Sequence, residues 1–178
     1  MPGGIDPHVH LELPFMGTVS IDDFNTGSRA ALAGGTTTYC DFVIPFGDVT
    51  LLEAYEDWRS RADKKTNCDY TLHVAICDWN EQTRKDMGEI VKRGVQSFKV
   101  FMAYKGSQLY QDDERLIQIF ARAKELGAVV MVHAENGVLI AHNQERLLKK
   151  GVTGPEGHPL SRNDEVEGEA THRAITIA

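Results

Sequence analysis

Short runs of apolar residues alternate along the chain with longer segments in which apolar residues recur every three or four positions. The short runs predict β-strands that are covered on both faces, and the longer segments predict amphipathic helices. Ser20 is the expected N-cap of the first helix. The predicted strands are 3–10, 36–43, 70–76, 95–102 and 128–133, and the predicted helices are 20–33, 51–62, 82–92, 112–126, 137–150 and 164–178.

Five successive strand–helix units predict a parallel sheet with helices on the outside. An open doubly wound sheet and a (β/α)8 barrel both have this alternation. Polar residues late in the strands favour the barrel, because a (β/α)8 barrel builds its active site at the ends of its strands. These residues are His8, His10, Asp41, Lys99 and His133. We therefore predict an α/β fold of the TIM (β/α)8 type, present here as about the first five βα units.

The ends of the sequence predict an incomplete domain. The chain begins within its first strand, and it stops inside the segment Arg173–Ala178 without a Gly or Asn cap. We expect a single domain over residues 1–178 that is truncated at both ends, as a segment of a longer protein. Each side of its sheet would then carry an unpaired strand edge.

Composition excludes several functional classes. The net charge of −7, together with the absence of a run rich in Lys and Arg, argues against a nucleic-acid partner. No apolar stretch has membrane-spanning length, and the N-terminus lacks a signal pattern, so we expect no membrane partner. Three widely spaced cysteines, Cys40, Cys68 and Cys77, indicate a reduced, cytoplasmic chain.

The first candidate chemistry is the pair His8 and His10. Successive side chains of a strand point to opposite faces, so these two imidazoles project the same way and Val9 points back. Two neutral imidazoles side by side suit Zn and similar ions. An isolated pair of this spacing is also common by chance. His73, in the third strand, points either into the barrel or into the packed core, and core packing is favoured.

Lys99 and His133 are the second candidate group. Lys99 lies among apolar residues and shares a strand face with Phe101. Burial disfavours an ammonium ion, so the pKa of this amine is expected to be lowered. A neutral amine beside a metal can react with CO2 to form a carbamate that bridges two ions. An ion pair with Asp41 or Glu135 is an equally good interpretation. His133 alone would be read as a hydrogen-bonded core histidine.

Six segments, taken together and in this order, resemble one known family over the whole chain. They are PGGIDPHVH (2–10), ALAGGTT (31–37), SFK (97–99), MAYK (102–105), HAENG (133–137) and GVTGPEGH (151–158). The family is that of the hydantoinases and dihydropyrimidinases, which are metal-dependent amidohydrolases.

The resemblance implies a TIM barrel with a binuclear zinc site, assembled as a homotetramer. It also implies hydrolysis of the ring amide of 5,6-dihydrouracil and dihydrothymine to N-carbamoyl-β-amino acids, a step of pyrimidine catabolism. By this resemblance His8 and His10 hold the more buried zinc ion, N6-carboxylated Lys99 bridges both ions, and His133 binds the second. A metal-bridging hydroxide would attack the ring, and Tyr104 would stabilise the developing oxyanion.

The resemblance also implies a further histidine ligand and a catalytic aspartate, and no residue of this sequence corresponds to either. His158 and His172 are poor substitutes, because one is expected in a loop and the other on a helix. The sequence therefore supplies only part of the family's site.

Two other classes share many of these motifs. Non-catalytic relatives of the collapsin response mediator type keep the fold and the tetramer and act in cytoskeletal signalling. They lose metal ligands, typically the lysine, so the presence of Lys99 together with His8, His10 and His133 argues against them. Dihydroorotase and allantoinase are sister enzymes. Dihydroorotase has an arginine two residues after the histidine pair, where this sequence has Glu12. A negative side chain at this position suits a neutral ring better than a carboxylate substrate.

Overall fold

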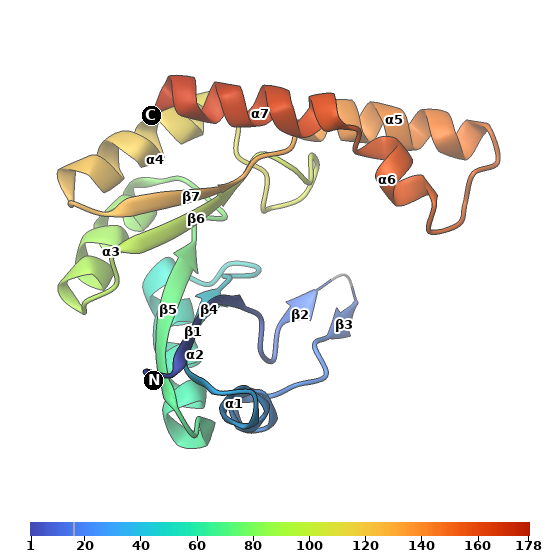
Figure 1. Ribbon diagram of the computed structural model, residues 1–178. Coiled ribbons are helices and arrows are strands. Elements are labelled where there is room, and N and C mark those ends of the chain that lie inside the picture. The colour runs from blue at the N-terminus through green and yellow to red at the C-terminus, as the bar shows by residue number, and fades with distance from the viewer. Residues whose placement is uncertain (16) are drawn as a thin grey trace. The chain divides into compact units, whose positions relative to one another are not determined.

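The computed structural model describes residues 1–15 and 17–178, which form a mixed α/β fold (Figure 1). The chain divides into two compact units. The first unit contains residues 1–75 and 85–97, and the second contains residues 76–84 and 98–178. The expectation of a single domain over residues 1–178 stays a prediction.

The first unit contains a parallel sheet in the strand order β1-β4-β5 (Figure 1). A helix connects each strand to the next, because parallel neighbours need a long crossover. The elements are β1 (Gly4–Val9), the short antiparallel pair β2 (Pro14–Phe15) and β3 (Thr18–Val19), α1 (Phe24–Ala33), β4 (Thr36–Val43), α2 (Leu51–Lys65) and β5 (Asp69–Ala75). Helix α3 (Glu81–Lys92) follows β5.

The second unit contains the neighbouring strands β6 and β7 (Figure 1). Just beyond β6, the Met102 N–H donates to the His133 carbonyl at 3.1 Å. Helix α7 packs beside α4, and the short α6 packs beside α5. The elements are β6 (Ser97–Phe101), α4 (Asp113–Glu125), β7 (Val129–His133), α5 (Gly137–Lys149), α6 (Gly157–Ser161) and α7 (Asp164–Ile177).

The predicted elements are all present. Strand β4 coincides with its prediction, and the other boundaries agree within three residues except at the start of the first helix. Phe42, Val43, Val74 and Phe98 are almost fully buried, as expected for strands covered on both faces. None of the helices in the part of the chain that the structure describes is long and apolar enough to cross a membrane.

The prediction that Ser20 caps the first helix is wrong. Asp23 is the N-cap, and its carboxylate accepts the Thr26 N–H at 2.7 Å. The Thr26 hydroxyl accepts the Asp23 N–H at 3.0 Å in return, which completes a capping box. The Ser20 hydroxyl instead accepts the Leu13 N–H at 2.8 Å. The β2–β3 pair and α6 were not predicted from the sequence.

Gly137 marks a close approach between the start of α5 and the chain that leaves β6. A Cβ atom at this position would lie 2.8 Å from the Met102 carbonyl oxygen and 3.2 Å from the Ala103 carbonyl carbon. Both neighbours are backbone atoms, which cannot rotate away as a side chain can. The Gly137 N–H also donates to the Met102 carbonyl at 3.1 Å. The absence of a side chain therefore allows α5 to start directly after the 133–136 segment.

We expect Gly137→Ala to lower the free energy of unfolding by about 1–3 kcal/mol, as for other overpacked sites. Urea denaturation followed by circular dichroism measures this change. The matched control is Gly168→Ala on α7, where a Cβ atom would have no neighbour within 4 Å. Because alanine is the better helix former, this control is expected to stabilise the protein by up to about 1 kcal/mol. Equal effects of the two changes would contradict the close approach at Gly137.

Candidate functional site

His8 and His10 lie at the carboxyl end of β1 and share a face, as the strand alternation predicts. Their ring centroids are 5.2 Å apart in an edge-to-face arrangement. Both rings lie against the ring of Phe42 on β4, at centroid distances of 4.3 Å for His8 and 4.9 Å for His10. Both histidines are exposed. The Phe42 ring thus packs against both imidazoles, which stay accessible to solvent.

His73 on β5 also lies against the Phe42 ring, at 4.8 Å between centroids. Its Nε2 is 3.0 Å from the Pro7 carbonyl oxygen, and its Nδ1 is 2.5 Å from the Ser97 hydroxyl. His73 is therefore tied to the residue just before His8. The sequence favoured core packing for this residue over a position inside the barrel. The signal that could have revealed this position is the parallel register of β4 and β5, in which His73 pairs with Phe42.

Asp41 was predicted among the polar residues of the site. It pairs in register with Val9 and lies fully buried on β4. One carboxylate oxygen accepts the Leu11 N–H at 3.2 Å, and the other has no hydrogen-bond partner among residues 1–15 and 17–178. Burial raises the pKa of this carboxyl to about 7. Asp41 therefore holds the backbone that follows His10 instead of joining the two imidazoles.

Lys99 on β6 is buried, with 8% of its surface exposed. Burial lowers the pKa of its amine, as predicted. The Nζ atom lies 5.4 Å from the centroid of the Phe101 ring, so the two residues share a face. The alternative, an ion pair of Lys99 with Asp41 or Glu135, stays a prediction, although Glu135 also has other partners. Its oxygens lie 2.6 Å from His133 Nε2 and 3.4 Å from Arg162 Nε.

Tyr104 and His133 gather around the same phenyl ring as Lys99. The centroid of Phe101 is 5.9 Å from each of the two rings, and Tyr104 and His133 are 5.5 Å apart. Tyr104 has a φ of 63°, a left-handed conformation that costs energy for any residue except glycine. Burial, and the negative charge of Glu135, raise the pKa of its phenol. Such strain at a predicted catalytic residue is typical of functional sites.

The predicted metal ligands are thus present as two pairs, one in each unit. His8 and His10 form the first pair, and Lys99 and His133 form the second. Within the described residues, no three His, Cys, Asp or Glu side chains gather as a metal-binding group. The convergence of all four ligands on one centre stays a prediction.

The secondary candidates contribute little to this arrangement. His158 lies on α6, not in a loop as predicted, and His172 lies on α7. Both are exposed. Cys40 and Cys77 are buried thiols, and Cys68 is half-buried. Burial raises the pKa of all three thiols, which keeps them protonated and poorly reactive near neutral pH.

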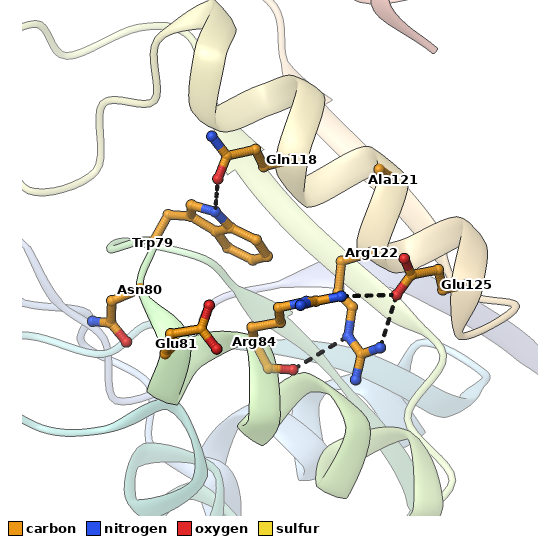
Figure 2. A pocket seen from close by; sticks show the side chains of 8 residues that line it. All are labelled: Trp79, Asn80, Glu81, Arg84, Gln118, Ala121, Arg122 and Glu125. Carbon is orange, nitrogen blue, oxygen red and sulfur yellow. Dashed lines mark hydrogen bonds and ion pairs between the residues drawn. The ribbon is translucent and has the colours of Figure 1, made fainter.

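A separate surface pocket of about 490 Å³ lies between the start of α3 and α4 in the second unit. Figure 2 shows the Trp79 indole on one side and the charged side chains on the other. The indole N–H donates to the Gln118 side chain at 2.5 Å. Arg84 and Arg122 approach the same oxygen of Glu125, at 3.4 Å and 2.9 Å. These paired charges tie α4 to α3, so we assign this pocket a structural role.

The comparisons with known proteins agree with these motifs. The model of the Amidohydrolase family matches residues 1–172. The chain is 58% identical over 179 residues to dihydropyrimidinase of Dictyostelium discoideum, and 52% identical over 179 residues to dihydropyrimidinase of Rattus norvegicus. Both alignments cover 100% of this chain but only 35% and 34% of those proteins. The chain therefore spans about a third of the length of these curated relatives.

Solved structures of hydantoinases and dihydropyrimidinases have the same fold. D-hydantoinase of Bacillus sp. AR9 superimposes with a TM-score of 0.94 at 45% identity, over 99% of this chain and 39% of that protein. Dihydropyrimidinase of Brevibacillus agri gives a TM-score of 0.95 at 45% identity, over 99% of this chain and 38% of that protein. The match covers both units, so the predicted fold class is confirmed.

Proposed function

Because this chain belongs to the amidohydrolase family, we propose that it supplies part of the active site of a cyclic amidohydrolase of the dihydropyrimidinase and hydantoinase type. The substrates would be small cyclic amides such as 5,6-dihydrouracil and dihydrothymine, and the products N-carbamoyl-β-amino acids. The names of its relatives, at 52–58% identity over the whole chain, support this reaction class.

One observation carries the proposal: both groups of predicted site residues are organised around a phenyl ring near the end of a strand. Phe42 supports His8 and His10 in the first unit. Phe101 has Lys99 and His133 close to it in the second. Strand ends of a (β/α)8 barrel are where catalytic residues are built.

The donor chemistry of these residues fits zinc. Imidazole nitrogens are common zinc ligands, and the lowered pKa of Lys99 favours the neutral amine that can take up CO2. We propose that His8, His10, His133 and N6-carboxylated Lys99 hold two zinc ions. When bound, such ions activate water and polarise a carbonyl group. The Tyr104 hydroxyl would donate a hydrogen bond to the oxyanion that develops as the ring amide opens.

Glu135 has a supporting role in this proposal. Its carboxylate lies 2.6 Å from Nε2 of His133 and 3.4 Å from Arg162. A carboxylate that bonds one nitrogen of a histidine fixes the ring and makes the other nitrogen a better ligand. We infer that His133 would use Nδ1 toward a metal while this contact persists. We further propose a homotetramer, as the resemblance implies, and a cytoplasmic location, as the three widely spaced cysteines suggest.

The test is zinc analysis and substrate turnover on the protein that contains this sequence, produced at its natural length. We expect about two zinc ions per chain and an ultraviolet-detected loss of dihydrouracil that stops when a chelator removes the metal. Dihydroorotate is the control substrate and is expected to react far more slowly, because position 12 lacks the arginine that dihydroorotase has there for the substrate carboxylate. A metal-free protein without turnover of any cyclic amide would contradict the proposal.

A further inference from the structure

The backbone that follows His10 is held from several sides within the first unit. The Leu11 N–H donates to buried Asp41 at 3.2 Å. The Leu11 side chain packs against Gly27 on α1, where a Cβ atom would come within 2.4 Å of Leu11 Cδ2. The segment that leaves the histidine pair therefore has a fixed path next to β4 and α1.

Glu12 is the most strongly constrained residue of this segment. Its φ of 50° places it in the left-handed region, which is unfavourable for a residue with a Cβ atom. Its side chain is only 15% exposed. Arg61 Nη1 lies 3.0 Å from Oε2, Lys65 Nζ bonds Oε1, and the Phe24 N–H reaches Oε1 at 3.4 Å. The Glu12 N–H in turn donates to the Asp22 carbonyl at 2.9 Å. Together these contacts can offset the cost of the backbone conformation.

Arg61 is also held by contacts within α2 that do not involve Glu12. Its guanidinium lies over the indole of Trp58, at 4.2 Å from the ring centroid. Its Nε donates to Asp57 one turn earlier on α2, at 3.0 Å. An arginine that is stacked and paired in this way loses little further freedom when it binds a carboxylate. Helix α2 therefore presents a rigid cation to the segment after β1.

We propose that Glu12 is a positioning residue for the metal ligands of the first unit. Its contacts with Arg61 and Lys65, called here the Glu12 clamp, fix the turn after β1 and so the direction of the His8 and His10 rings. This inference rests on the proposed function, because it concerns the same ligand pair. It also replaces the sequence-based interpretation of Glu12 as a selector against anionic substrates, since two cations of α2 occupy its carboxylate.

The inference is tested with Glu12→Gln and Arg61→Met in the protein at its natural length. Glutamine keeps the size of the side chain but removes the charge, and methionine keeps most of the apolar stem. We expect each change to weaken zinc binding about tenfold or more in a chelator competition assay, the scale seen for residues that orient metal ligands. The value of kcat should fall while KM changes little. The double variant should bind zinc no more weakly than the single variant with the larger loss of zinc affinity, because both changes break the same clamp.

Glu56→Gln is the matched control, since Glu56 lies on the same helix and pairs with Arg93 at 3.1 Å, outside the clamp. We expect this variant to keep the zinc affinity and kcat of the wild type. If Glu12→Gln lowers the unfolding midpoint but leaves zinc affinity and kcat unchanged, Glu12 is only structural and the inference is wrong. A wild-type protein that binds no zinc would refute the proposed function itself, whatever the variants do.

Discussion

Replacing Lys99 by methionine is expected to abolish hydrolysis of dihydrouracil by the protein at its natural length and to reduce its zinc content from about two ions to one or fewer. Methionine has nearly the same length and volume as the aliphatic part of lysine, so the buried strand β6 keeps its packing. It cannot form a carbamate. The bridge between the two proposed metal positions would therefore be lost.

A stability measurement shows whether Lys99→Met loses zinc and activity without unfolding. Lys99 is buried, and its lowered pKa means that burial already disfavours its charged form. An apolar side chain of similar volume avoids that cost and is often neutral or stabilising. We expect the midpoint of urea denaturation of the metal-free protein to be unchanged or higher in Lys99→Met. Lys92→Met on α3 is the control, because Lys92 is exposed and pairs with Glu89. It should keep both zinc ions and turnover.

Carboxylation can be tested on the wild type as well. Metal-free protein supplied with zinc in buffer without CO2 should regain little activity, and added bicarbonate should restore it. Full activity without bicarbonate, or full zinc content in Lys99→Met, would show that position 99 does not bridge the ions. Zinc would then have to be held by imidazoles and carboxylates alone.

Much of this fold follows from the sequence because local and tertiary preferences agree. In β4, the β-branched and aromatic residues from Thr36 onward are followed by Pro45, and the strand ends at Val43. The start of α1 was missed because Ser20 and Asp23 are both good caps. Only the reciprocal contact between Asp23 and Thr26 decides between them.

Residues that share a face of one strand were also predictable, since strand alternation alone places His8 beside His10 and Lys99 beside Phe101. The supporting residues were not. His73 reaches the Pro7 carbonyl through β-sheet register, and Glu12 reaches Arg61 across 49 positions of sequence. Neither contact leaves a periodic pattern in the sequence. A carboxylate two residues after a histidine pair also invites an interpretation as a substrate selector, although Glu12 contacts Arg61 and Lys65 of α2 instead.

Replacing Tyr104 by phenylalanine tests the other half of the proposed chemistry. The ring packing against Phe101 and His133 would be kept, because only the hydroxyl is removed. If this hydroxyl donates to the developing oxyanion, kcat should fall by about 10²–10³-fold, as when one such donor is removed from other enzymes. Zinc content and KM should change little, since the hydroxyl is expected to act mainly in the transition state.

The pH profile gives this prediction a second readout. Burial raises the pKa of Tyr104 above its ordinary value of 10, so the phenol stays protonated and able to donate through neutral and mildly alkaline pH. The ratio of wild-type to Tyr104→Phe kcat should therefore stay constant from about pH 6 to 9. Tyr110→Phe is the matched control, in which the backbone bridge to Phe101 remains and kcat should be unchanged. A ratio near one throughout would remove Tyr104 from the reaction and leave its strained backbone as a purely structural feature of the chain that follows β6.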